Sequence, residues 1–313
     1  MKLTIGSRGS QLALWQANHI SALLREQGHE VEILIIKTTG DKLQEVTFAQ
    51  VGSKGMFTKE IEEALADGTI DLAVHSLKDL PTELADQFVL AATPPRVDPR
   101  DVLVSVKYEN LSALPQGARV GTSSQRRRAQ LKALRPDIEA VEFRGNVDTR
   151  LRKLAEGQLD AILLAAAGLD RLEKTDWVRE RLEAKDFCPA AGQESLGIET
   201  RKNDLETIAA LQFLNDPATR FAVTTERAAL AALGGGCQVP IGIHCKAVAA
   251  GDSGSSVEVF GVVAVPETGA AVRVYEQVPM AGSDPVALGQ LIARKLVEAG
   301  AGPLLEAASG AAN

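Results

Sequence analysis

The first half of the chain repeats one pattern of hydrophobic and polar positions: a short apolar run, a polar loop and an amphipathic helical stretch. Apolar runs of strand length cover residues 2–5, 31–37, 70–74, 119–121, 140–143 and 159–164. Helical patterns are found between Ser10 and Gly28, at 58–66, from 125 onward and at 147–155. Strands that alternate with helices predict a mostly parallel sheet with helices on its faces.

The pattern changes from about Asp216 onward. A helical stretch leads into a glycine-rich loop, and three apolar runs separated by glycine-rich turns come next, before a closing helix. In order, these elements cover residues 222–233, 241–248, 256–265, 271–278 and about 285–299. The order predicts a small α+β domain with a three-stranded antiparallel sheet.

Segments that bear proline or glycine, at 93–99, 189–192 and 215–217, are candidate joints between domains. The chain would then cross from a first α/β lobe to a second lobe and back to the first. This layout is typical of a hinged two-lobe binding protein that binds an anion between its lobes. The expected domains are a first lobe of 1–94 and 195–215, an arginine-rich second lobe of 95–194, and an α+β domain of 216–313.

Composition narrows the class of protein. The chain has 313 residues, of which 45% are hydrophobic and 24% charged, as in a soluble globular protein of two or three domains. We find neither an apolar run of membrane-spanning length nor the apolar core of a signal peptide. Three cysteines, an odd number, argue against a disulfide framework. We therefore expect a cytoplasmic protein with free thiols.

Charge is distributed unevenly along the chain. The net charge is −7, yet residues 119–153 carry ten Lys or Arg and four Asp or Glu, so this segment is +6 and the remainder −13. In α/β sheets, ligands bind beyond the carboxyl ends of the strands. The residues near those predicted ends are Arg8, Ser10, Lys78, Asp79, Thr122, Ser123, Ser124, Arg126, Arg127, Arg144 and Arg150. A solvated basic face is the alternative, but this placement favours an anion site built from guanidinium groups and helix N-termini.

A second chemical signal is the loop 233–240, in which three glycines directly precede Cys237. Glycine lets the backbone turn sharply, and Pro240 ends any helix soon afterwards. A thiol that bonds to a large partner needs such a presentation; a helix C-cap beside a small apolar residue is the alternative. We interpret Cys188 and Cys245 as packing residues.

Six segments together resemble the porphobilinogen deaminase, or hydroxymethylbilane synthase, family over nearly the whole chain. They are 6–16 (GSRGSQLALWQ), 52–60 (GSKGMFTKE), 71–81 (DLAVHSLKDLP), 121–127 (GTSSQRR), 144–150 (RGNVDTR) and 234–240 (GGGCQVP). The resemblance implies a monomer of three domains, the first two periplasmic-binding-protein-like. It also implies a transferase of tetrapyrrole (heme) biosynthesis, which condenses four porphobilinogens head to tail, with loss of ammonia, into the linear tetrapyrrole hydroxymethylbilane.

The resemblance also implies roles for particular residues. Cys237 would carry a dipyrromethane cofactor through a thioether, Asp79 would be the catalytic carboxylate, and no metal is implied. Cofactor and substrate carboxylates would be bound by Arg8, Ser10, Lys78, Thr122, Ser123, Ser124, Arg126, Arg127, Arg144, Arg150 and Arg171. Further candidates are Lys54, Phe57, Asn146 and Gln193. We also hypothesise that residues 40–57 form a lid, and we interpret His75 as structural.

One departure from the family pattern is Gly192-Gln193-Glu194, where family members commonly have Gly-Gln-Gly. The alternative function is a non-catalytic two-lobed binding protein for small anions, which explains the arginines but not the third domain or the Cys237 loop. Net acidity and an aromatic content of 4% argue against a nucleic-acid partner.

Overall fold

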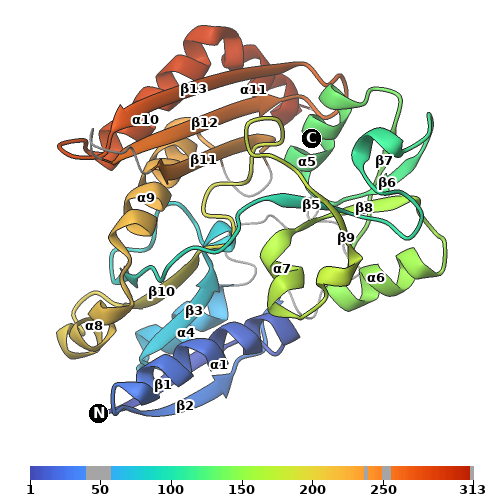
Figure 1. The fold of residues 1–313 in the computed structure, drawn as a ribbon. Coiled ribbons are helices and arrows are strands. Elements are labelled where there is room, and N and C mark those ends of the chain that lie inside the picture. The colour runs from blue at the N-terminus through green and yellow to red at the C-terminus, as the bar shows by residue number, and fades with distance from the viewer. Residues whose placement is uncertain (40–57, 236–238, 249–254, 311–313) are drawn as a thin grey trace. The chain divides into compact units, whose positions relative to one another are not determined.

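The computed structural model describes residues 1–39, 58–235, 239–248 and 255–310 (Figure 1). The chain divides into two compact units: unit 1 consists of residues 1–97 and 194–220, and unit 2 of residues 98–193 and 221–313. Three of the predicted site residues, Lys54, Phe57 and Cys237, lie outside the described residues, and so does the predicted lid at 40–57.

Unit 1 contains a five-stranded sheet in the order β2-β1-β3-β10-β4. Strands β1, β2 and β3 are parallel, whereas β10 runs antiparallel to both β3 and β4. Buried side chains of the strands and of helices α1 and α8 form its main core. The elements are β1 (Lys2–Ser7), α1 (Gln11–Glu26), β2 (Glu30–Ile35), α4 (Lys59–Ala66), β3 (Leu72–Ser76), β4 (Phe88–Ala92), β10 (Leu196–Arg201) and α8 (Leu205–Leu211).

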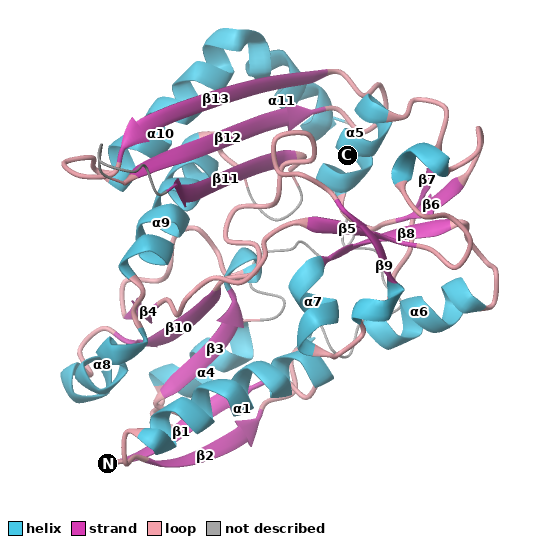
Figure 2. Cartoon of the chain, viewed as in Figure 1, coloured by secondary structure: helices cyan, strands magenta, loops and turns pink. Residues whose placement is uncertain are grey.

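Unit 2 contains a second five-stranded sheet, in the order β7-β6-β8-β5-β9 (Figure 2). Strands β6, β7 and β8 are parallel, and β5 runs antiparallel to β8 and β9. The elements are β5 (Asp101–Val104), β6 (Arg119–Gly121), α5 (Gln125–Leu134), β7 (Glu139–Val141), α6 (Val147–Ala155), β8 (Ala161–Ala165), α7 (Ala166–Arg171) and β9 (Val178–Arg181).

The two sheets share one topology. In each, the fourth strand in the spatial order, β10 or β5, is the first strand after the chain has crossed from the other unit. This arrangement confirms the predicted fold class of two periplasmic-binding-protein-like α/β units joined by crossings. The mostly parallel sheet was predicted from local patterns. The antiparallel strand of each sheet was not, because its partners are distant in the sequence.

Unit 2 also contains the predicted antiparallel sheet, in the order β11-β12-β13. One face of β12 packs on α10, and the other contributes to a small core with Ala129 and Cys188. The antiparallel sheet therefore shares buried surface with the arginine-rich part of the same unit. The elements are α9 (Pro217–Ala232, which begins in unit 1), β11 (Ile241–Val248), β12 (Ser256–Ala264), β13 (Ala271–Pro279), α10 (Pro285–Leu296) and α11 (Gly302–Gly310).

The predicted closing helix is longer and more complex than its sequence pattern indicated. Helix α10 ends at Leu296, a π-helical segment covers Val297–Ala301, and α11 continues beyond it. Gly300 has φ +102°, a conformation that glycine adopts without steric cost, and it redirects the chain there. Alanine-rich sequence after Gly300 favours a further helix, which the amphipathic pattern alone did not reveal.

Candidate anion-binding and catalytic site

In unit 1, the predicted site residues follow the carboxyl ends of the parallel strands β1 and β3. Ser10 is the N-cap of α1, and its side chain accepts a hydrogen bond from the Ala13 backbone N–H at 3.3 Å. Lys78 and Asp79 lie in a short 3₁₀ turn directly after β3, where Asp79 is exposed and Lys78 is partly buried. Arg8 follows β1 and is also partly buried.

His75, at the end of β3, is a structural residue, as expected. It is buried and its Nε2 lies 2.9 Å from Oε2 of Glu199, which is fully buried on the neighbouring strand β10. The pairing holds the end of β3, which leads directly into Lys78 and Asp79. No local pattern could have predicted it, because Glu199 lies 124 residues away in the sequence.

In unit 2, the corresponding edge is formed by the carboxyl ends of β6, β7 and β8. Ser124 is the N-cap of α5 and Asn146 the N-cap of α6; their side chains accept from Arg127 N (3.4 Å) and Thr149 N (2.9 Å). Thr122 is buried and accepts from the Ser124 N–H at 3.2 Å. These polar side chains therefore order the loops that carry the arginines, whatever they bind in addition.

Arg126 and Arg127 are both buried and both contact the buried carboxylate of Asp101. The separation is 2.6 Å from Arg126 Nη1 to Oδ2 and 2.7 Å from Arg127 Nη2 to Oδ1. Gln193 joins the same cluster, because its Nε2 donates to Asp101 Oδ1 at 3.0 Å. Burial opposes ionisation of Asp101, yet the charges of the two arginines hold its pKa well below its usual range.

Asp101 was missed by the sequence analysis. It lies at the start of β5, outside the basic segment, and its Asp-Pro-Arg-Asp context indicates a turn rather than a site. The excess of arginine over carboxylate between 119 and 153 was the available signal, since a buried guanidinium needs a partner.

Three further predicted arginines lie on the same unit. Arg144 Nε donates to Glu142 at 2.6 Å, and Arg150 Nε donates to the Gly145 carbonyl at 2.8 Å. Burial lowers the pKa of Arg150 to about 10, and repulsion from Arg127 and Arg144 acts in the same direction, against the attraction of Glu142. Like charges are therefore held close together here. Arg171 ends α7 and is partly buried.

The loop before Cys237 begins as predicted. Gly234 has φ +66°, and a Cβ on Gly235 would lie 2.5 Å from Cδ1 of Leu230. The left-handed conformation of Gly234 favours glycine in the turn that follows α9, whereas the contact at Gly235 is with the end of a flexible Leu side chain that can move. Cys188 and Cys245 are both buried, and burial raises the pKa of Cys188 to about 12. We therefore assign both to packing, as expected.

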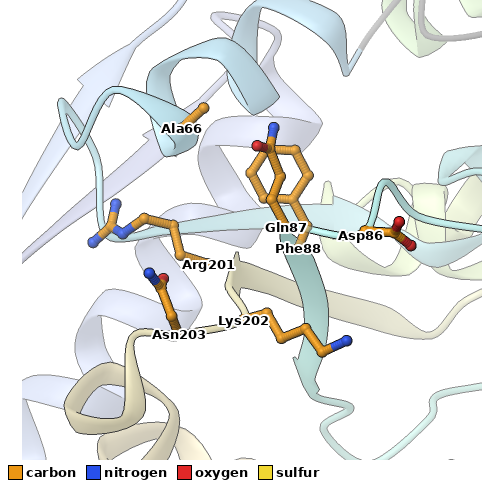
Figure 3. A pocket seen from close by; sticks show the side chains of 7 residues that line it. All are labelled: Ala66, Asp86, Gln87, Phe88, Arg201, Lys202 and Asn203. Carbon is orange, nitrogen blue, oxygen red and sulfur yellow. The ribbon is translucent and has the colours of Figure 1, made fainter.

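A pocket in unit 1 lies away from the predicted site residues (Figure 3). Arg201, at the carboxyl end of β10, lines it; because β10 runs antiparallel to β3, this edge of the sheet is opposite the one that carries Asp79. The Arg201 guanidinium donates to the Ile70 carbonyl at 2.6 Å and to Asp204 at 2.6 Å. The lining residues are Ala66, Asp86, Gln87, Phe88, Arg201, Lys202 and Asn203.

None of the helices in the described residues has both the length and the apolar character needed to cross a membrane. Within the same residues, His, Cys, Asp and Glu side chains do not come together in a group of three or more that could bind a metal ion.

Two sequence models of one family match the chain. The one described as "Porphobilinogen deaminase, dipyromethane cofactor binding domain" matches residues 3–209, and the one described as "Porphobilinogen deaminase, C-terminal domain" matches residues 220–298. The chain belongs to the porphobilinogen deaminase family. A relative with that name from Trichlorobacter lovleyi is 50% identical over 307 residues, which are 97% of this chain and 96% of the relative. Another, from Geobacter sulfurreducens, is 47% identical over 308 residues, 97% of this chain and 94% of the relative.

Solved structures with a similar trace include the methionine-binding protein MetQ, at 13% identity and a TM-score of 0.43 over 70% of this chain and 92% of that one. A periplasmic substrate-binding protein of an ABC transporter from Coxiella burnetii has 16% identity and a TM-score of 0.42, over 70% of this chain and 94% of that one.

Membership of the porphobilinogen deaminase family gives the departure at Glu194 a structural meaning. Glu194 has φ +67°, which L-residues other than glycine adopt at a cost. A glycine at this place, as the family pattern described above implies, would fit that conformation without strain.

Proposed function

We propose that this chain is a hydroxymethylbilane synthase, a transferase of tetrapyrrole biosynthesis that joins four porphobilinogens head to tail with loss of ammonia. The observation that carries this proposal, beside family membership, is the arginine group at the carboxyl edge of the unit 2 sheet. Arg127 and Arg144 both repel the charge of Arg150, and an anion bound beside Arg150 would offset this repulsion. A chain of pyrroles bearing acetate and propionate groups supplies several such anions.

The cofactor of the proposed enzyme is dipyrromethane, attached to Cys237 by a thioether. The residues described fit such a polycarboxylate, because several arginines and two helix N-termini share one edge of unit 2. When bound, the cofactor supplies the primer to which the porphobilinogens are added. Cys237 would hold the cofactor through its sulfur, for which the thiolate is the reactive form of the side chain.

Asp79 is our candidate for the catalytic carboxylate. It is exposed at the end of the turn that follows β3, and the buried pair of His75 and Glu199 fixes that strand. A carboxylate beside a pyrrole N–H can stabilise the positive charge that develops on the ring and can accept its proton. Arg8, Ser10 and Lys78, on the same edge of unit 1, would bind carboxylates of the chain being extended.

The test of attachment is the intact mass of the purified protein. The wild-type chain should weigh more than its sequence by two linked pyrrole units, and Cys237→Ser should lose that excess together with activity. Cys245→Ala is the matched control and should keep the excess, because Cys245 is buried in the antiparallel sheet. A purified wild-type protein that has only the mass of its amino-acid sequence, without an attached group, would overturn the proposal and favour a binding protein for small anions.

The test of Asp79 is Asp79→Asn. The variant should keep the mass excess, but its kcat should fall by at least about a hundredfold, as for loss of a positioned acid–base group. Asp86→Asn is the control, because Asp86 lines the pocket at the opposite edge of the sheet, and its kcat should remain that of the wild type. Turnover by Asp79→Asn at the wild-type rate would remove Asp79 from the catalytic role.

We also propose the finer points of organisation: three domains as predicted from the sequence, a monomer, and a cytoplasmic location. Cys188, a buried free cysteine, supports a reducing compartment. Sedimentation of the loaded enzyme tests the monomer, and a single species of twice the chain mass would contradict it.

A further inference from the structure

Asp101 lies where its carboxylate can fix the positions of the Arg126 and Arg127 guanidinium groups. It is the first residue of β5, it is fully buried, and its two carboxylate oxygens face the two guanidinium groups. Oδ1 accepts from Arg127 Nε at 2.9 Å and from Arg126 Nη2 at 3.2 Å, and Oδ2 accepts from Arg126 Nη1 at 2.6 Å. One carboxylate therefore fixes two neighbouring guanidinium groups in a single geometry.

The two arginines differ in the number of N–H donors that remain for a ligand. Arg126 directs its Nη hydrogens at protein acceptors: Nη1 donates to Asp101 and to the Cys188 carbonyl (2.6 Å), and Nη2 to Asp101 and to Gln193 Oε1 (3.4 Å). Arg127 donates from Nε to Asp101 and from Nη1 to the Leu163 carbonyl at 3.2 Å, and its Nη2 lies 2.7 Å from Asp101 Oδ1. Since a guanidinium carries five N–H groups, Arg127 retains one hydrogen on Nη1 and one on Nη2, whereas all four Nη hydrogens of Arg126 face protein acceptors.

We propose that Asp101 is a positioning residue, which presents Arg127 to cofactor and substrate carboxylates and uses Arg126 as a brace. The inference rests on the proposed function and deepens it, because it separates two adjacent arginines that the sequence presents as equivalent. One carboxylate against two guanidinium groups leaves a net positive charge, so the pair still attracts an anion while its geometry is fixed.

A second buried carboxylate, that of Glu226, fixes the segment that carries Gln193. Gln193 donates from Nε2 to Asp101 and to the Pro99 carbonyl at 2.7 Å, so its side chain is fixed beside β5. The preceding residue, Gly192, donates its backbone N–H to Glu226 Oε2 at 2.7 Å. Glu226, on α9, is fully buried and also accepts from the Cys245 N–H at 2.7 Å. Glu226 thereby anchors the segment that supports Asp101 to the antiparallel sheet of the same unit.

The test is Asp101→Asn, which keeps the shape of the side chain and removes its charge. Losing a charge-assisted pair should let Arg127 leave its position, so KM for porphobilinogen should rise about tenfold. For protein that carries the cofactor mass, kcat should stay within about threefold of wild type, since Asp101 touches no reacting atom. Asp98→Asn is the control: it breaks ion pairs with Arg100 and Arg181 in the same unit and should leave KM unchanged.

Glu226→Gln keeps the test decisive if Asp101→Asn does not fold. It alters the outer anchor, together with its 3.3 Å contact with His244 Nδ1, and should raise KM by about threefold, in the same direction but less than Asp101→Asn. A wild-type or lower KM in the variant that folds, with the wild-type enzyme loaded and active, would overturn the positioning role and leave the proposed function intact. A wild-type protein without cofactor mass and without porphobilinogen consumption would overturn both.

Discussion

At the scale of single residues, two glutamates occupy backbone conformations suited to glycine. Glu194, with φ +67°, is buried at the residue where the chain returns to unit 1, and Glu173, with φ +56°, is exposed just after α7. At Glu173 the backbone N–H groups of Glu173 and Lys174 donate to the carbonyls of Asp170 (3.2 Å) and Leu169 (2.8 Å). This is the pattern of a helix that ends in a left-handed residue, a position where glycine is preferred.

Glu173→Gly should therefore stabilise the protein, because glycine relieves the left-handed strain. We expect the free energy of unfolding to rise by about 1 kcal/mol, measured by chemical denaturation. Glu206→Gly is the matched control, since Glu206 is an exposed residue within α8, where glycine costs about 1 kcal/mol. Equal destabilisation of both variants would contradict the argument.

At the scale of elements, helices α9 and α10 of unit 2 approach each other closely at Gly289. A Cβ on Gly289, in α10, would lie 2.4 Å from the Thr225 carbonyl oxygen and 2.8 Å from the Cβ of Ala228. Helix α9 also carries Glu226 and leads to the Cys237 loop. A shift of α9 away from α10 would therefore move both the anchor of Asp101 and the start of that loop.

Gly289→Ala should force the two helices apart and lower the free energy of unfolding by about 1–3 kcal/mol, as overpacking does elsewhere. The control is Gly302→Ala in α11, where a Cβ meets nothing within 4 Å and alanine favours the helix. Thermal unfolding of both variants beside the wild type measures the difference. A Gly289→Ala protein as stable as Gly302→Ala would show that the helices can separate without cost.

At the scale of the whole molecule, the two units differ in how many of their carboxyl groups have a pKa that the fold lowers or raises. Among described residues, unit 2 has four carboxyl groups whose pKa is lowered, whereas unit 1 has two together with Glu62, whose pKa is raised by burial and by the nearby charge of Glu199. The lowered groups are Asp98, Asp101, Asp137 and Glu258 in unit 2, and Asp67 and Asp204 in unit 1.

We therefore predict that unit 2 unfolds first in acid. A carboxyl group with a lowered pKa stabilises the fold above its unfolded pKa, and that contribution is lost as the pH falls through the folded value, below about 4. Glu62 acts in the opposite direction, because its raised pKa makes the fold of unit 1 more stable once it is protonated.

The chain offers a direct measurement, because its two tryptophans are divided between the units: Trp15 in unit 1 and Trp177 in unit 2. Trp15→Phe leaves a reporter for unit 2, and Trp177→Phe leaves one for unit 1. The fluorescence of Trp177 should change at a higher pH than that of Trp15. Coincident transitions would show that the units unfold together.

The sequence by itself determined the features that depend on neighbours along the chain. Strand and helix periodicity predicted the α/β pattern, the three antiparallel strands and the edge that collects the arginines. The helix caps at Ser10 and Ser124 followed from side chains that satisfy backbone N–H groups a few residues away. Family motifs added the candidate roles of Asp79 and Cys237, which stay predictions.

Tertiary structure alone decided the features whose partners are distant in the sequence. It brought Asp101 to Arg126 and Arg127, Gly192 to Glu226, and His75 to Glu199, and it inserted β5 and β10 into their sheets. A buried charge is tolerated only beside a counter-charge or fixed donors. Which residue supplies them depends on strand order and on chain crossings, which local patterns of polarity do not encode.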